Sequence, residues 1–333
     1  MAEPVKIFYL ITSTNYGGTE RALHELICRI DKEAFDVSVC SVKNPGGFAK
    51  RLQAEAHGFY TLGLAEAGGW QALLTFVPAL LRLLRLLKGQ RPQIVHSFLF
   101  RANILGRLAG RLAGIPIVIS SVRVIESHKK YKYFIDRMTS SLVDRYTAVS
   151  EAARRFVLAQ ADVSAEKVLT IYNGVDVHHE CRPAPLDFAV AENVFKVAFI
   201  SRFDKQKGHA VLLRALKNVV VRNNNIIVYL WGEGPEEAQI KNMVAAADLS
   251  VYVCFMGTVD AVRSYLTRMD ALVLPSLWEG MPNVVLEAMA EAKPVIASRI
   301  PGLDEVVVDG RTGLLVEPGD ADGFAEAMIT LME

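Results

Sequence analysis

Short hydrophobic runs of four to eight residues alternate along the chain with longer segments in which apolar residues recur every three or four positions. The short runs predict buried β-strands, and the longer period predicts helices that lay one face on a sheet. The expected strands are residues 5–11, 36–42, 58–64, 94–98, 116–122, 146–150, 168–174, 196–201, 226–232, 251–257, 271–276, 294–298 and 313–318. Because these runs are apolar almost throughout, the pattern predicts an α/β fold with parallel sheets buried on both faces.

The segment 176–193 interrupts this alternation with two prolines and no hydrophobic period. A chain of 333 residues is long enough for two domains. We therefore expect an N-terminal domain over residues 1–178, a linker over 179–193 and a C-terminal domain over 194–333. Each should be a Rossmann-like, doubly wound parallel sheet, and the two should face an interdomain cleft. Since ligands of such sheets bind beyond the carboxyl ends of the strands, functional motifs should follow strands directly.

Charge and cysteine usage narrow the class of protein. The chain has 37 basic and 36 acidic residues, so no global field favours a nucleic-acid partner. Its four cysteines lie far apart, which favours free thiols in a reducing cytoplasm. The most apolar stretch, residues 73–88, is interrupted by Arg82, Arg85 and Lys88, so we expect no membrane-crossing helix. Two interpretations of residues 70–88 stay open: a helix that packs on the sheet, which we favour, or peripheral contact with the inner face of a membrane.

Two carboxylates flank a predicted helix start in EGMPNVVLEAMAEAKPVIAS, residues 279–298. Glu279 lies in a loop after the strand 271–276, and Asn283 is a suitable N-cap for a helix that begins at Val284. Glu287 and Glu291 follow Asn283 at intervals of four, so the three should form one polar stripe that faces the cleft. Glu287 could accept hydrogen bonds from a ribose diol, and Glu279 from sugar hydroxyls near a phosphate at the helix start. The alternative is that both acids only answer the helix dipole.

Two cations follow the first strand of the second half, in ISRFDKQKGH (residues 200–209). Arg202 and Lys207 should emerge into the cleft, where together they could neutralise a diphosphate. The alternative is a solvated basic loop, because Asp204, Lys205 and Gln206 are expected at the surface.

Weaker signals complete the set of candidate residues. Gly17 and Gly18 stand between the first strand and a helix, where they would allow a phosphate to approach, although a tight turn capped by Thr19 explains them equally well. The Asp-x-Asp at 320–322 precedes the last helix, so we interpret it as an N-cap and expect no metal site. His178 and His179 are adjacent in the expected linker and would not converge on one ion.

Several motifs together carry a family resemblance: GGTER (17–21), VSEAARRF (149–156), IYNGVD (171–176), SRFDKQKG (201–208), GEGPE (232–236), FMGTVDAV (255–262), PSLWEGMPNVVLEAMAEAKPVIAS (275–298) and DGRTGLLVEPGD (309–320). The chain resembles, almost end to end, the retaining nucleotide-sugar-dependent glycosyltransferases of the GT-B fold, known as group 1 or family 4. The Glu-x7-Glu spacing of Glu279 and Glu287 is highly specific for this family.

The resemblance implies roles for individual residues. The C-terminal domain would hold the donor and the N-terminal domain the acceptor. Arg202 and Lys207 would contact the donor diphosphate, Glu279 the transferred sugar and Glu287 the ribose, and the catalytic residues would be Glu279, Arg202 and Lys207. No cofactor and no metal is implied, since the nucleotide sugar is a substrate. The further donor-binding residues would be Gly17, Gly18, Gly257, Val259, Gly280, Met281, Pro282, Asn283 and Val284.

The chain departs from the family pattern in two places. Many relatives carry a cleft histidine where this chain has Arg123, so Arg123 and His96 are the candidates for the acceptor side, and Arg123 could act there only through its charge. Relatives also end in a helix that crosses back onto the N-terminal domain, whereas this chain stops at ITLME and is expected to lack it.

The expected function is retaining transfer of a hexose-type sugar from a nucleotide-diphosphate sugar, with UDP as the expected nucleotide, to a hydroxyl of a carbohydrate or lipid-linked acceptor. The pathway would be glycolipid, lipopolysaccharide or exopolysaccharide biosynthesis in the cytoplasm. Two alternatives stay open: a nucleotide-sugar epimerase of the same fold, and a non-catalytic nucleotide-sugar-binding protein.

Overall fold

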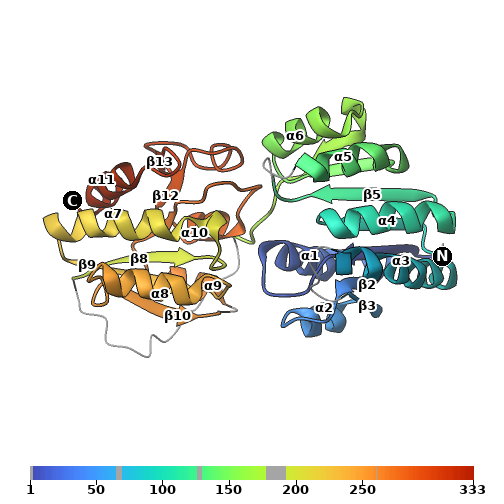
Figure 1. The fold of residues 1–333 in the computed structure, drawn as a ribbon, viewed down its shortest axis with the longest axis horizontal. Helices are drawn as coiled ribbons and strands as arrows, with labels where there is room; N and C mark the ends of the chain where they lie inside the picture. Colours follow the sequence, from blue (N-terminus) through green and yellow to red (C-terminus); the bar gives the residue numbers. More distant parts are fainter. Residues whose placement is uncertain (1–2, 65–69, 126–129, 178–192, 260) are drawn as a thin grey trace. The chain divides into compact units, whose positions relative to one another are not determined.

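The computed structural model describes residues 3–64, 70–125, 130–177, 193–259 and 261–333. The chain forms two compact units, Met1–Asn173 (unit 1) and Gly174–Glu333 (unit 2) (Figure 1). The expected linker 179–193 falls almost entirely outside the described residues, so the domain boundaries stay a prediction.

Unit 1 is built around a seven-stranded sheet of order β3-β2-β1-β4-β5-β6-β7, in which every neighbouring pair is parallel. The strands are β1 (Val5–Ile11), β2 (Phe35–Lys43), β3 (Gly58–Leu64), β4 (Ile94–Phe98), β5 (Ile117–Val122), β6 (Arg145–Ala148) and β7 (Val168–Thr170). The helices are α1 (Gly18–Arg29), α2 (Ala49–Glu55), α3 (Trp70–Gln90), α4 (Phe100–Ala113), α5 (Lys130–Thr139) and α6 (Glu151–Ala161).

Both faces of this sheet are buried because successive side chains of a strand point to opposite sides. In β1, Phe8 and Leu10 join a core with residues of α3 and α4, whereas Tyr9 and Ile11 join a second core with residues of α1 and α2. The doubly wound layout predicted from the apolar runs is therefore confirmed.

Helix α3 covers the segment for which two interpretations were open. Its residues Ala79, Leu83 and Leu87 are buried in the core of unit 1, which confirms that the helix packs on the sheet. Val77 and Leu81 on the same helix are exposed. No helix in the part of the chain that the structure describes combines the length and the apolar character that crossing a membrane requires.

Unit 2 repeats the design with a six-stranded parallel sheet of order β10-β9-β8-β11-β12-β13. Val197 and Phe199 of β8 face α7, α8 and α11, whereas Ala198 faces α9 and α10. The strands are β8 (Phe195–Ile200), β9 (Ile226–Trp231), β10 (Val253–Gly257), β11 (Ala271–Leu274), β12 (Val295–Ser298) and β13 (Gly313–Val316). The helices are α7 (His209–Arg222), α8 (Glu237–Ala246), α9 (Val262–Leu266), α10 (Asn283–Ala290) and α11 (Ala321–Met332).

Candidate functional site

The carboxyl ends of β8 and β11 bring together residues that are more than seventy positions apart in the sequence. Lys207 belongs to a 3₁₀ turn, η3 (Lys205–Lys207), which follows β8, and Glu279 lies in the loop after β11. Because β8 and β11 are neighbouring parallel strands, their loops leave the sheet at the same edge. The sequence prediction that Lys207 and Glu279 share one site is thereby consistent with the geometry.

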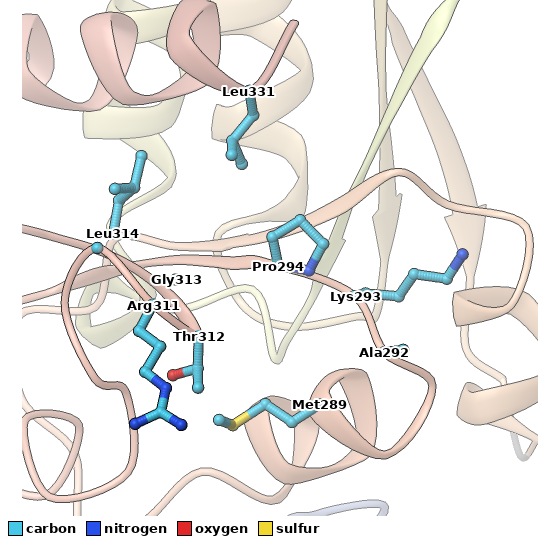
Figure 2. Close-up of a pocket in the computed structure, with 10 residues that line it drawn as sticks. Met289, Ala292, Lys293, Pro294, Arg311, Thr312, Gly313, Leu314 and Leu331 are labelled. Carbon is cyan, nitrogen blue, oxygen red and sulfur yellow. The ribbon is translucent and has the colours of Figure 1, made fainter.

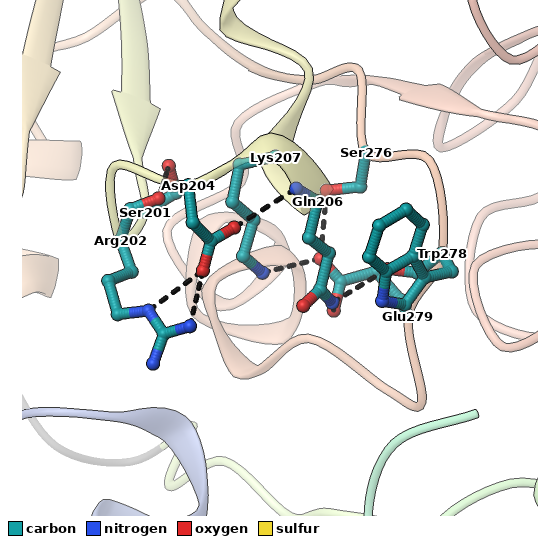
Figure 3. A network of polar contacts seen from close by, with 8 residues as sticks. All are labelled: Ser201, Arg202, Asp204, Gln206, Lys207, Ser276, Trp278 and Glu279. Atoms are coloured by element: carbon teal, nitrogen blue, oxygen red, sulfur yellow. Dashed lines mark hydrogen bonds and ion pairs between the residues drawn. The ribbon is translucent and has the colours of Figure 1, made fainter. Parts of the chain in front are cut away.

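The Glu279 carboxylate accepts hydrogen bonds from three side chains (Figure 3). Lys207 Nζ lies 2.5 Å and Ser276 Oγ 2.8 Å from Oε1, and Gln206 Nε2 lies 3.3 Å from Oε2. Only 6% of Glu279 is exposed, and Ser276 is fully buried. A buried carboxylate is stable only when it is paired and hydrogen-bonded, and this one is both.

A second set of contacts runs from this carboxylate to Arg202. Gln206 Nε2 also donates to the Trp278 carbonyl at 2.7 Å, and the Gln206 backbone N–H donates to Asp204 Oδ1 at 3.1 Å. Asp204 Oδ2 accepts from Arg202 Nε at 2.8 Å and from Arg202 Nη2 at 2.5 Å. The expectation that Asp204 and Gln206 are surface residues was wrong, since both are half-buried and bonded. Asp204 caps the turn η3, a local signal that the sequence carried.

Arg202 and Lys207 differ in their surroundings. Two thirds of the Arg202 side chain is exposed and its guanidinium is bonded to Asp204, whereas the Lys207 side chain is 18% exposed and bonded to Glu279. The structure therefore places both cations beside one turn but pairs them with different acids. Their joint contact with a diphosphate stays a prediction.

The turn that carries Lys207 is held close to the loop that carries Glu279. Gly208 has a φ of +72°, and a Cβ atom on it would lie 2.0 Å from the Pro275 carbonyl oxygen. The Leu277 N–H donates to the Gln206 carbonyl at 2.7 Å. A glycine at position 208 is thus required both by its backbone conformation and by the approach of the second loop.

Helix α10 carries Glu287, which is 8% exposed and lies outside the first turn. That position weakens the alternative that Glu287 only answers the helix dipole, which acts mainly in the first turn. The expected start of the helix was wrong by one residue: α10 begins at Asn283, and the cap position is Pro282 with no capping side chain. The expected polar stripe is also divided, because Glu291 forms an ion pair with Arg263 at 2.6 Å.

The other residues expected near the donor lie around this end of unit 2. Met281 is buried, and Gly280, at the other side of Pro282, is buried as well. Gly257 ends β10 with a φ of +67°, and its carbonyl accepts from the Gly232 N–H at 2.8 Å. Val259 packs against the core beneath α10. Val284 is half-buried at the start of α10.

In unit 1, Gly17 and Gly18 join β1 to α1, as the sequence predicted. Helix α1 begins at Gly18 and its cap position is Gly17, so the alternative of a turn capped by Thr19 was wrong. Glu20 in the first turn is 6% exposed and accepts a hydrogen bond from Ser13 Oγ at 3.0 Å. Sequence reasoning passed over Glu20, although its place in GGTER was visible.

His96 and Arg123 also lie in unit 1. His96 is the third residue of the five-residue strand β4, so the expectation that it borders the strand was wrong. Its Nε2 lies 2.8 Å from Ser121 Oγ, and burial together with the Arg123 charge lowers its pKa to about 3. Arg123 follows β5, its Nη2 donates to Asn173 Oδ1 at 2.7 Å, and burial lowers its pKa to about 10. Near pH 7, His96 is neutral and Arg123 charged.

The acidic pair near the C-terminal end has a structural role. Asp320 caps α11 by accepting from the Gly323 N–H at 2.9 Å, and Asp322 accepts from Asn218 at 2.6 Å, which confirms the capping interpretation. His178 and His179 lie outside the described residues. Within the described ranges, no group of three or more His, Cys, Asp or Glu side chains is arranged to hold a metal ion.

A pocket of about 420 Å³ lies elsewhere in unit 2 (Figure 2). Its walls include Met289 of α10, Leu331 of α11 and the segment Gly310–Leu314. Residues 293–294 and 310–312 precede β12 and β13, so the pocket lies at the amino ends of these parallel strands, away from the Glu279 edge. None of the predicted site residues lines it.

A buried histidine next to the site predicts acid sensitivity. His209 is 4% exposed between the rings of Phe199 and Phe203, and burial lowers its pKa to about 4. Because the unfolded chain binds this proton from about pH 6.5, the stabilising contribution is present above that pH and is lost as the pH falls towards 4. Urea unfolding at pH 7 and pH 5 should show that His209→Met reduces the difference in unfolding free energy by about 2 kcal/mol. The exposed His57 serves as the control, and an equal effect of His57→Met would contradict the assignment.

Comparisons with known proteins cover nearly the whole chain. Residues 194–333 match the family described as glycosyl transferases group 1, and residues 16–179 match glycosyltransferase family 4. The UDP-Gal:alpha-D-GlcNAc-diphosphoundecaprenol alpha-1,3-galactosyltransferase of Escherichia coli is 26% identical, over 99% of this chain and 88% of that protein. The alpha-maltose-1-phosphate synthase of Mycolicibacterium smegmatis is 28% identical, over 95% of this chain and 86% of that protein.

Solved structures agree with these sequence matches. HepE from Anabaena, crystallised with UDP and glucose, superimposes with a TM-score of 0.84 at 22% identity, over 99% of this chain and 90% of that one. The sucrose-phosphate synthase of Thermosynechococcus elongatus gives a TM-score of 0.81 at 18% identity, over 98% and 90% of the two chains. The likeness confirms the predicted fold class: two parallel-sheet α/β domains of the GT-B type.

Proposed function

Because the chain belongs to the group 1 glycosyltransferases, we propose that it transfers a hexose-type sugar from a UDP-sugar to a hydroxyl acceptor with retention of the anomeric configuration. Glycosyltransferase activity of the GT-B type follows from the family, and the donor, the acceptor and the stereochemistry are the proposal. The observation that carries it is the Lys207–Glu279 pair at the carboxyl end of the unit 2 sheet.

The pair provides both kinds of group that a nucleotide sugar requires. Lys207 presents an ammonium, which suits a diphosphate, and Glu279 presents a carboxylate, which suits sugar hydroxyls. In the reaction the bond between the anomeric carbon and the diphosphate oxygen breaks, and a bond to the acceptor oxygen forms. The acceptor proton leaves with the UDP. Lys207 and Arg202 stabilise the charge that develops on the leaving diphosphate, and we propose that the transfer needs no metal ion.

UDP as the nucleotide is supported by related proteins. HepE was crystallised with UDP and with UDP-glucose, and the Escherichia coli relative is named for UDP-Gal. The name of that relative also includes a diphosphoundecaprenol acceptor, and another relative, CapM of Staphylococcus aureus, is named for capsular polysaccharide biosynthesis. We therefore propose a carbohydrate or lipid-linked acceptor and a cytoplasmic protein that reaches lipid-linked substrates by peripheral membrane contact. Arg123 and His96 are the proposed acceptor-side residues.

Product analysis tests the proposal. The chain is incubated with UDP-glucose or UDP-galactose and a panel of lipid-linked and saccharide acceptors, with and without EDTA. We expect glycosylated acceptor and UDP in equal amounts, and no loss in EDTA. Free epimerised sugar with UDP in the absence of acceptor would favour an epimerase instead. Donor binding without turnover on every acceptor would favour a binding protein.

A further inference from the structure

We propose that Gln206 is a specificity residue for the donor sugar: it fixes one oxygen of Glu279 and presents its own carbonyl as a second acceptor beside it. This inference rests on the proposed function, because it concerns the sugar that the same site would bind. The role follows from the contacts of three side chains, Gln206, Lys207 and Ser276, which converge on Glu279 (Figure 3).

The orientation of the Gln206 amide is determined by its partners. Its Nε2 lies 2.7 Å from the Trp278 carbonyl oxygen and 3.3 Å from Glu279 Oε2. Both partners can only accept, so the amide nitrogen must be the atom that faces them. The two N–H bonds of this amide are thereby both used, and its Oε1 must point elsewhere.

The remaining capacity of Glu279 can be counted. A carboxylate oxygen accepts about two hydrogen bonds. Oε1 already accepts from Lys207 and Ser276, whereas Oε2 accepts from Gln206 alone among these donors. One acceptor position on Oε2 is left for a ligand. Glu279 by itself is therefore suited to a single sugar hydroxyl.

Gln206 Oε1 supplies the second acceptor. No donor to this atom is found within the described ranges of the chain, and the residue is half-buried, so part of it is accessible. The amide belongs to the same group that bonds Glu279 Oε2, so the two acceptors lie side by side. A pair of adjacent acceptors matches two neighbouring hydroxyls on a hexose ring.

The backbone of Gln206 is held on both sides, which limits the movement of its amide. Its N–H donates to Asp204 Oδ1 at 3.1 Å, and its carbonyl accepts from the Leu277 N–H at 2.7 Å. A polar group that is fixed before binding loses less freedom when the ligand arrives. Gln206 is therefore preorganised for recognition, and its neighbour Lys207 connects the sugar contact to the diphosphate contact.

Calorimetric titration with UDP, UDP-glucose and UDP-galactose separates the sugar contact from the nucleotide contact. Gln206→Met should weaken binding of the better UDP-sugar by about 10-fold, the usual size for hydrogen bonds to charged groups, and should change UDP binding less than about twofold. The matched control is Gln239→Met on the exposed face of α8. It should leave both affinities unchanged.

A second variant gives a signature that a merely structural residue would not show. Gln206→Glu puts a second carboxylate against Glu279, so one of the two should be protonated more readily. We expect its UDP-sugar affinity to recover by several-fold as the pH is lowered from about 8 to 5.5, while Gln206→Met stays flat over the same range. A proton shared between the two carboxylates restores the lost donor.

Three results would overturn the inference while the parent chain still binds UDP-sugars. These are an unchanged preference for UDP-sugar over UDP in Gln206→Met, an equal loss for both ligands, or a pH response of Gln206→Glu that matches that of Gln206→Met. Failure of the parent chain to bind any UDP-sugar would instead overturn the proposed function, and this inference with it.

Discussion

Replacing Lys207 by methionine should lower kcat for sugar transfer by about 100-fold, as expected for loss of one preorganised charge at a leaving group. The Lys207 side chain is largely buried and its ammonium lies 2.5 Å from Glu279. Its charge is thus held at the point where the diphosphate would gain negative charge. Steady-state kinetics at saturating donor and acceptor measure the effect.

The control for this variant lies two residues earlier in the same turn. Lys205 is exposed, and Lys205→Met should leave kcat within about twofold of the parent, since surface charges act weakly. Circular dichroism should show that both variants are folded. Equal rates for the two folded variants would mean that Lys207 does not act on the leaving group.

Gly208→Ala should destabilise unit 2 by about 3 kcal/mol or more, the range for backbone strain combined with a steric clash. The φ of +72° already disfavours any other residue, and the new Cβ would meet the Pro275 carbonyl oxygen at 2.0 Å. Because both partners are backbone, the clash can be relieved only by moving the turn that carries Lys207. Donor binding should therefore weaken together with stability, as followed by urea unfolding and calorimetric titration.

Gly319→Ala separates the two causes. Gly319 also has a positive φ, +85°, but no heavy atom lies within 4 Å of the position of its Cβ. This variant should cost only about 1–2 kcal/mol, the penalty for a left-handed conformation alone. If Gly208→Ala were no more destabilising than Gly319→Ala, the close approach of the two loops would be wrong.

Sequence patterns were sufficient for the strands of the fold. The run VKIFYLI predicts residues 5–11, and β1 spans Val5–Ile11. The run VLTIYNG overestimates β7, which ends at Thr170, because an apolar run does not show where pairing with the neighbouring strand stops. Parallel pairing buries both faces, and such strands carry a strong local signal.

The site was only partly predictable. Glu279, Lys207 and Arg202 could be identified because charged residues directly after buried strands are conspicuous. The roles of Gln206 and Ser276 could not, since their hydrogen bonds to Glu279 depend on how two loops meet in space. The cap of α10 was misplaced by one residue because Asn283 is a strong capping residue by local propensity, whereas Pro282 occupies the cap position here.

The central claim is that Lys207 and Glu279 form the donor site, and titration of UDP into the parent chain and Lys207→Met tests it most directly. The account predicts that UDP binds the parent chain and binds Lys207→Met at least about 10-fold more weakly, because a charge-assisted contact to the diphosphate is lost. Equal dissociation constants for the two proteins, both folded, would contradict it.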